Sequence, residues 1–212
     1  MSVWKGLLEW SLQHHDGTRA SQPMSAEDRA WLEEAMQSSV VDLGKRMQEL
    51  TALLSSRVPQ AQTEEISATS EAVLEMERAL DELVEIVEHV DCATDLARIG
   101  GLPVLLSCLA CPGAPSLRAK AGEVLGTCVQ NNAPAQDAFL AAGAGEALLP
   151  LLADSHAGAR TKALFALSCQ LRNHAPSQRW FCGVGGVSVL ARLLRDVQPG
   201  PRRKALQLLA HL

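Results

Sequence analysis

The sequence predicts an all-α solenoid, because the same residue types recur at a step of 42 along the second half of the chain. Seven columns keep this step: Gly101/Gly143/Gly185, Leu106/Leu148/Leu190, Leu109/Leu151/Leu193, Arg118/Arg160/Arg202, Lys120/Lys162/Lys204, Ala121/Ala163/Ala205 and Leu125/Leu167/Leu209. A period of about 40–47 residues is typical of armadillo and HEAT repeats, whose units stack on one continuous core. We therefore expect a right-handed armadillo-type superhelix over residues 70–212, with a helical N-terminal extension over 1–60.

The N-terminal extension is expected to be partly flexible. Residues 4–13 read as a short amphipathic helix, and the polar stretch 14–23 reads as a loop. Ser25 is a good N-cap for a following helix through Trp31 and Met36.

A further helix is expected from about residue 40 to 54, followed by a polar linker at 55–69 that contains Pro59. From Ser70 onward the pattern is continuously helical. Residues 70–90 are predicted to form a degenerate copy of the repeat. Their helix is expected to cap the solenoid, since terminal repeats are commonly atypical.

Each full unit reads as three helices, which favours armadillo over HEAT. In the second unit the helices are expected at 135–142, 145–152 and 159–173. The periodic glycine of this unit, Gly143, falls between the first two helices. A turn there that needs a positive φ would exclude most other residues.

The net charge of −5 argues against a general nucleic-acid binder, which usually has a basic balance. The net charge conceals an uneven distribution of charge along the sequence. Residues 64–95 hold eleven acids and one base, a net charge of −10, whereas residues 155–212 hold nine bases and one acid, a net charge of +8. Each charge taken alone is explained by a solvated helix face, but together the two segments could steer a partner with complementary patches.

Nothing in the sequence points to a membrane, to export or to a metal. The first residues lack the apolar core and cleavage site of a signal peptide, and no apolar run reaches the roughly 18 residues of a membrane span. Cys108 and Cys111 form a CxxC without a second ligand pair, and Cys128 and Cys169 read as buried thiols of a reducing compartment. We expect a monomer without cofactors in the cytoplasm, with the nucleus or an association with the endoplasmic reticulum as alternatives.

One side of the third helices is expected to form a binding groove. In the second unit this strip holds Lys162, Phe165, Cys169 and Arg172. The counterparts in the other units are Lys120, Glu123, Thr127 and Gln130, then Lys204, Gln207 and His211, and in the capping helix Arg78, Asp81 and Glu85. The repeated Trp and Asn ladder of armadillo receptors for nuclear-localisation signals is absent, which argues against that function.

No catalytic motif is present in the sequence. There is no G-x-S-x-G, no phosphate loop and no His-rich metal motif, and the six histidines are scattered. The sequence therefore favours a binding protein over an enzyme.

Several local strings are more specific than the repeat. LLEWSL at 7–12, DCATDL at 91–96, VQNN at 129–132 and RTKALFALSCQLRNH at 160–174 resemble the Fes family of nucleotide-exchange factors for the seventy-kilodalton heat-shock chaperone, which is related to the heat-shock-protein-binding-protein group. The resemblance covers nearly the whole chain and is closest to plant and algal members. It implies an armadillo body that embraces one lobe of the chaperone's ATPase domain, so that ADP and bound client are released, without enzymatic activity.

The resemblance also implies site residues. By motif match, Ala93 in DCATDL and Lys204 in RRKALQLL fall at positions that the family uses against the chaperone, with helix packing and solvation as their alternatives. In the family the N-terminal segment competes with client. Leu7, Leu8 and Trp10 would be its apolar anchors here, unless they dock on the solenoid itself. Family members usually carry further helices after the third unit. The alternative to exchange activity is that the chain is a generic armadillo scaffold for protein–protein interaction.

Overall fold

The computed structural model describes residues 25–39, 42–63, 70–210 and 212, and it divides the chain into two compact units, 1–42 and 43–212. The first unit contains helix α2 (Ala26–Ser39). Ser25 caps this helix as predicted. Its Oγ accepts a hydrogen bond from the backbone N–H of Asp28 at 3.0 Å and donates one to the Asp28 carboxylate at 2.6 Å.

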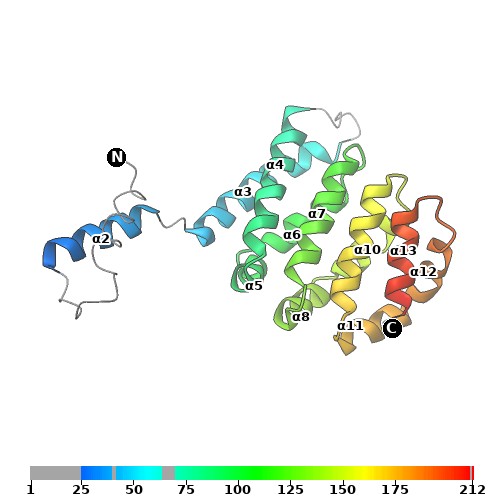
Figure 1. Ribbon diagram of the computed structural model, residues 1–212. Helices are drawn as coiled ribbons and strands as arrows, with labels where there is room; N and C mark the ends of the chain where they lie inside the picture. Colours follow the sequence, from blue (N-terminus) through cyan, green and yellow to red (C-terminus); the bar gives the residue numbers. More distant parts are fainter. Residues whose placement is uncertain (1–24, 40–41, 64–69, 211) are drawn as a thin grey trace. The chain divides into compact units, whose positions relative to one another are not determined.

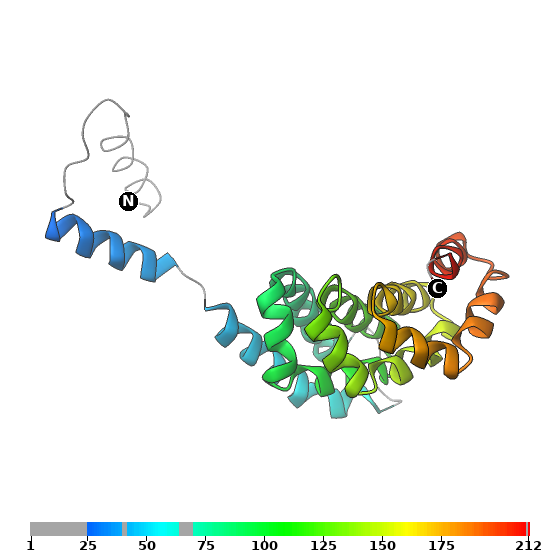
Figure 2. The same cartoon turned by 90° about the horizontal axis from the view of Figure 1, so that it is seen from below.

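The second unit contains helices and no strands over its described residues (Figures 1 and 2). Two helices come first, α3 (Leu43–Ala61) and α4 (Glu71–Val87). Three triplets follow: α5 (Val90–Arg98), α6 (Gly101–Leu109) and α7 (Pro115–Cys128); α8 (Ala133–Ala141), α9 (Ala144–Leu148) with the 3-10 helix η1 (Pro150–Ala153), and α10 (Ala157–Leu171); α11 (Ala175–Gly183), α12 (Gly186–Leu193) and α13 (Pro199–Leu209). The predicted all-α solenoid with three helices per unit is confirmed.

The third helices of successive units pack side by side, so that α4, α7, α10 and α13 form one layer (Figure 1). Small residues allow this close approach, because the alanine column of the Arg-x-Lys-Ala motif is fully buried. A Cβ atom at Gly126 of α7 would lie 2.5 Å from the ring of Phe165 on α10. The first helices each place one large side chain in the core: Leu96, Phe139 and Phe181.

Helix α3 is longer than the sequence suggested. It continues through Pro59 to Ala61, so the predicted linker is wrong for residues 55–61. Val58 and Ala61 are buried, and their burial offsets the intrahelical hydrogen bond that Pro59 removes. Since α3 packs on α4 and α6, the compact unit begins at Leu43, earlier than the boundary near residue 60 drawn from the sequence.

The glycine column supplies the turn between the first and second helices, with one correction. Gly143 and Gly185 have φ values of 74° and 75°, as predicted. In the first unit the left-handed residue is Gly100, with φ of 82°, whereas Gly101 lies inside α6. Each of these turns adopts a conformation that a residue with a side chain rarely tolerates.

Because Gly100 takes the turn position, the repeat register of the first unit is shifted by one residue. Leu105 is buried and is the structural counterpart of Leu148, whereas Leu106, which the sequence pattern placed in that column, is only half-buried. The first and second helices of the first two units are therefore 43 residues apart (143 − 100), while their third helices keep the step of 42 (160 − 118).

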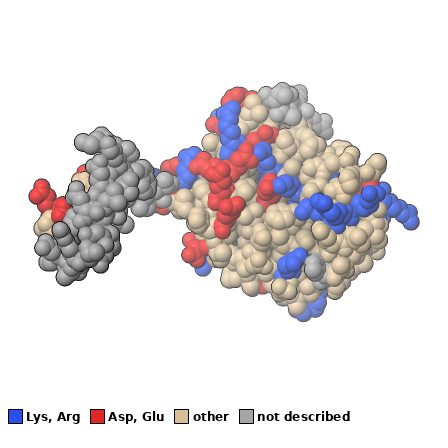
Figure 3. Space-filling view, in the orientation of Figure 1, with Lys and Arg blue, Asp and Glu red and all other residues tan. Residues whose placement is uncertain are grey.

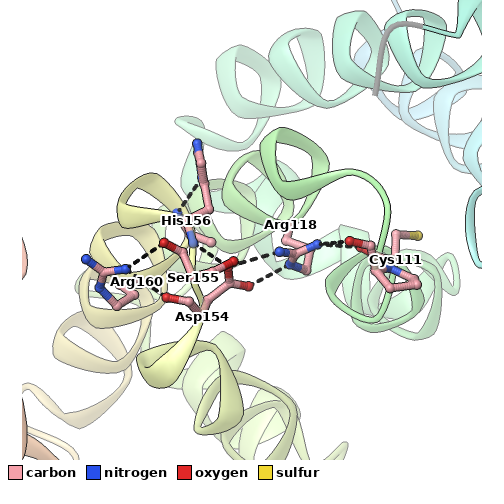
Figure 4. Close-up of polar contacts among 8 residues, drawn as sticks. Cys111, Arg118, Asp154, Ser155, His156 and Arg160 are labelled. Atoms are coloured by element: carbon pink, nitrogen blue, oxygen red, sulfur yellow. Dashed lines mark hydrogen bonds and ion pairs between the residues drawn. The ribbon is translucent and has the colours of Figure 1, made fainter. Parts of the chain in front are cut away.

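A buried arginine–aspartate clamp joins successive units (Figure 4). Arg118 of α7 places Nε and Nη2 at 2.7 and 3.0 Å from the carboxylate oxygens of Asp154. Its Nη1 donates to the backbone carbonyls of Cys111 and Pro112 at 2.7 and 2.8 Å. The guanidinium thus ties the end of α6 to the connector that precedes α10 in the next unit.

Arg160 repeats this clamp one unit later, with Nε and Nη2 at 2.7 and 3.1 Å from the carboxylate oxygens of Asp196. Burial by itself would raise the pKa of the Asp196 carboxyl, but the hydrogen bonds from Arg160 lower it below its usual range. The same balance lowers the pKa of Asp154. Arg202, the third arginine of the column, is exposed and forms no ion pair within the described residues.

Candidate functional site

Two adjoining recesses open on the face formed by the third helices. The first, of about 570 Å³, is lined by residues of α4, α5, α7 and α10, and we call it the Ala93 recess. The second, of about 300 Å³, is lined by residues of α10 and α13 and of the segment after α7, and we call it the Lys204 recess. Gln130, Asn131 and Phe165 line both, so the two recesses form one continuous groove.

Nine of the residues that the sequence placed on this strip or at a chaperone contact line the groove: Ala93, Glu123, Thr127, Gln130, Phe165, Cys169, Arg172, Lys204 and Gln207. Five others line neither recess: Lys120, Lys162, Arg78, Asp81 and Glu85. Ala93 is only 2% exposed and also belongs to the hydrophobic core, so it serves packing and recess together. His211 and the proposed apolar anchors Leu7, Leu8 and Trp10 lie outside the described residues.

Sequence reasoning missed several lining residues: Asn131, Ser168, Val84, Val87 and Val90. One signal was available. Asn131 follows α7 with φ of 54°, and Asn173 follows α10 with φ of 55°. Asparagine is among the few residues that tolerate this left-handed conformation, so the strings VQNN and LRNH marked the same turn in two units.

The Ala93 recess exists because a small residue stands where the next unit has a glutamine. Ala93 and Gln136 occupy corresponding positions of α5 and α8 (136 − 93 = 43). The Gln136 side-chain amide donates to the backbone carbonyls at the end of α10, those of Cys169, Gln170 and Arg172, at 2.8, 3.3 and 3.1 Å. The residues 42 positions before these three all line the Ala93 recess: Thr127, Cys128 and Gln130. An alanine cannot reach them, so the space stays open.

The lysines of the Arg-x-Lys-Ala column reach back to the neighbouring third helix, each to the residue 39 positions earlier. The three pairs are Lys120 with Asp81, Lys162 with Glu123 and Lys204 with Phe165. The first two are ion pairs, and neither Lys120 nor Lys162 lines a recess. In the third, the Lys204 Nζ lies 5.5 Å from the centroid of the Phe165 ring, within range of a cation–π contact.

Charge is unevenly distributed along this face (Figure 3). Acidic side chains gather over α4, and basic side chains gather over α10 and α13. The acidic and basic segments of the sequence thus meet on one surface of the solenoid. The Ala93 recess is lined by Glu88 and Glu123, whereas the Lys204 recess is lined by Lys204 and Arg172 without an acidic residue.

The cysteines are shielded to different degrees. Burial raises the pKa of the Cys108 thiol to about 12 and that of Cys111 to about 11, and it raises the pKa of Cys128 further. Cys169 lines the Lys204 recess, but burial raises its pKa to about 11 against the opposing effect of the neighbouring cations. Cys182 is exposed.

We therefore expect a maleimide at pH 7 to modify about one thiol per native chain rapidly, at Cys182, because the thiolate is the reactive form and burial suppresses it elsewhere. Intact-mass spectrometry of the native and the urea-denatured protein measures this. Six modified thiols are expected after denaturation. Rapid labelling of several native thiols would show that the core opens more readily than its packing implies.

One serine–histidine–aspartate constellation is present, and its role is structural. His174 Nδ1 lies 2.7 Å from Ser177 Oγ, and Nε2 lies 3.0 Å from the Asp137 carboxylate. Ser177 is fully buried, and the Gln170 side-chain amide already donates to its Oγ at 2.7 Å. A substrate has no access to this hydroxyl, so the network ties α8, α10 and α11 together instead of serving catalysis.

Over the described part of the chain, no three His, Cys, Asp or Glu side chains are grouped so that they could hold a metal ion. No single described helix is long and apolar enough to cross a membrane. One pair, Val90–Arg98 with Gly101–Leu109, passes by length and composition when its two helices, bent by 87°, are taken together.

Known structures resemble the fold of this chain. An engineered protein from a structural genomics consortium has a TM-score of 0.64 and 21% identity, with 89% of this chain and 40% of that chain covered. A designed armadillo repeat protein in complex with the peptide (KR)4 has a TM-score of 0.60 and 19% identity, with 88% of this chain and 77% of that chain covered. These similarities support the armadillo-type architecture.

Relatives found by sequence identify the family more specifically than the similar structures do. Hsp70-binding protein 1 of Rattus norvegicus is 38% identical over 150 residues, and that of Homo sapiens is 34% identical over 148 residues. Each alignment covers 68% of this chain and 41% of the relative, so the chain spans less than half the length of these curated relatives.

Family models match both halves of the chain. Residues 4–96 match the model described as nucleotide exchange factor Fes1, and residues 92–211 match the model described as the SIL1/FES1/HPBP1 C-terminal domain. The second match includes most of the groove and covers more than half of the chain, and the chain therefore belongs to the SIL1/FES1/HPBP1 family.

Proposed function

We propose that the chain is an adenyl-nucleotide exchange factor that binds the ATPase domain of an Hsp70 chaperone through the groove and promotes release of ADP, and with it release of client. The observation that carries the proposal is the groove itself, which lies on the third helices within a chain matched by both family models. The relatives named Hsp70-binding protein 1 support the choice of partner.

The groove offers a recessed shape and unevenly distributed charge for binding a partner surface. A binding protein accelerates nucleotide release when it binds an open conformation of its partner more tightly than the closed one. By linkage, the partner held open then binds ADP more weakly by the same factor. A hundredfold preference corresponds to about 2.8 kcal/mol, which a few well-buried interface side chains can supply.

Stiffness of the solenoid supports this mechanism. The buried clamps of Arg118 and Arg160 fix neighbouring units to each other, and the third helices approach closely at Gly126. A stiff surface resists the closing of its partner, whereas a pliable one would follow it. We propose that one chain with one groove acts as a monomer on one chaperone ATPase domain.

The test is release of a fluorescent ADP analogue from a full-length Hsp70 chaperone, chased with excess ATP in a stopped-flow instrument. At saturating protein the release rate is expected to rise at least about tenfold. An unchanged rate despite measurable binding would overturn exchange activity and favour a scaffold function instead. Absence of binding would overturn the choice of partner.

A further inference from the structure

The lysine column follows a rule along the third helices. Lys120 pairs with Asp81 and Lys162 pairs with Glu123, in each case with the acid 39 positions earlier on the preceding third helix. At the next step the rule places residue 165 opposite Lys204, and this residue is a phenylalanine. The series of ion pairs is therefore broken at one position, by one residue.

The break changes the electrostatics of the Lys204 recess. The Lys204 Nζ lies 5.5 Å from the Phe165 ring centroid and has no carboxylate within ion-pair distance among the described residues. A cation–π contact at a partly exposed site holds the ammonium in place, but it leaves the charge uncompensated. Arg172 adds a second cation to the same recess.

Neutral donors complete the recess. The amides of Gln130, Asn131 and Gln207 and the hydroxyl of Ser168 line it beside the two cations. Two cations and several hydrogen-bond donors around a small recess form a site for a carboxylate, because hydrogen bonds between charged groups are the strong ones. The Ala93 recess differs: valines and Glu88 line it, no lysine or arginine does, and its Glu123 carboxylate is already paired with Lys162.

We propose that Phe165, by breaking the ion-pair series, makes the Lys204 recess a binding site for an Asp or Glu side chain on the surface of the chaperone's ATPase domain. This inference rests on the proposed function and names the chemistry of its contact. The two recesses differ in charge and adjoin at Phe165. They therefore accept a partner surface in one orientation, with its carboxylate at Lys204.

Phe165→Glu tests the inference directly, because it restores the missing acid of the series and pairs Lys204 within the chain. Affinity for the isolated ATPase domain, measured by calorimetry, is expected to fall about tenfold. The salt dependence of the association rate is expected to become weaker as well. Phe165→Leu is the matched comparison: it removes the ring without adding charge, so its loss of affinity is expected to be clearly smaller than that of Phe165→Glu.

Lys204→Gln gives a second route that leaves Phe165 in place. Its affinity is expected to fall by a factor similar to that of Phe165→Glu, and the double variant is expected to lose little more, because both changes remove the same cation from the partner. All variants are compared by thermal melting, so that a loss of folding is recognised.

The outcomes separate this inference from the proposed function. If the unaltered chain accelerates ADP release and Phe165→Glu and Lys204→Gln bind like it, the carboxylate site is wrong and the exchange function stands. Binding of millimolar inorganic phosphate to the free chain that is lost in Lys204→Gln, with no loss of that variant's affinity for the ATPase domain, would show a free-anion site and overturn the assignment to a protein side chain. If the unaltered chain does not bind the ATPase domain, both proposals are wrong.

Discussion

Replacing Arg160 by alanine is expected to destabilise the protein by about 3–5 kcal/mol, because one partner of a buried ion pair is removed and the other stays behind. The Arg160 side chain is 13% exposed and that of Asp196 is 8% exposed. The variant leaves the Asp196 carboxylate with the backbone N–H of Gln198 at 2.8 Å, and the backbone carbonyls of Asp154 and Ser155 lose their donor.

Arg202→Ala is the matched control for this change. Arg202 occupies the same position of the next third helix, but it is exposed and has no ion pair among the described residues. Its replacement is expected to change stability by less than about 0.5 kcal/mol. Urea unfolding followed by circular dichroism measures both variants. Equal midpoints for the two would mean that the clamp contributes nothing beyond helix propensity.

The fold could be predicted from the sequence because the third helices keep one period without insertion. Their Ala and Leu columns are set by stacking against the neighbouring unit, and this packing recurs from unit to unit. The position of the turn glycine in the first unit was harder to predict. Gly100 and Gly101 are adjacent, and the pattern gave no reason to prefer the first. The choice depends on the connection from α6 to α7. The first residue of α7 lies 14 positions after the first residue of α6, whereas the first residue of α10 lies 13 positions after the first residue of α9 (115 − 101 and 157 − 144).

The binding strip could also be predicted in large part, since residues that share a helix face with a fixed spacing stay together when the helix forms. The recesses could not. Whether a side chain lines a recess depends on what the neighbouring helix offers it, and acids on the preceding third helix hold Lys120 and Lys162. The Ala93 recess depends on a missing side chain, which becomes visible only once the 43-residue register relates Ala93 to Gln136.

Ala93→Gln is expected to fill the Ala93 recess without harming the fold, and this separates binding from stability. A glutamine here can donate to the backbone carbonyls at the end of α7, as Gln136 does at the end of α10 with distances of 2.8–3.3 Å. We expect stability to stay unchanged or to rise by up to about 1 kcal/mol. Because the space is then occupied, affinity for the Hsp70 ATPase domain and acceleration of ADP release are expected to fall at least about tenfold.

The size and the charge of the side chain at position 93 can be varied separately. Ala93→Ser is the matched control, since a hydroxyl is too short to reach the carbonyls of α7 and leaves the recess open; exchange activity should persist. Ala93→Arg should abolish binding, but it brings a long cation from a position that is 2% exposed and should also lower the melting temperature. The decisive result is the pair of measurements on Ala93→Gln. A stable variant with undiminished ADP release would place the chaperone contact away from this recess. A variant that unfolds would mean that the core, more than the recess, requires alanine at this position.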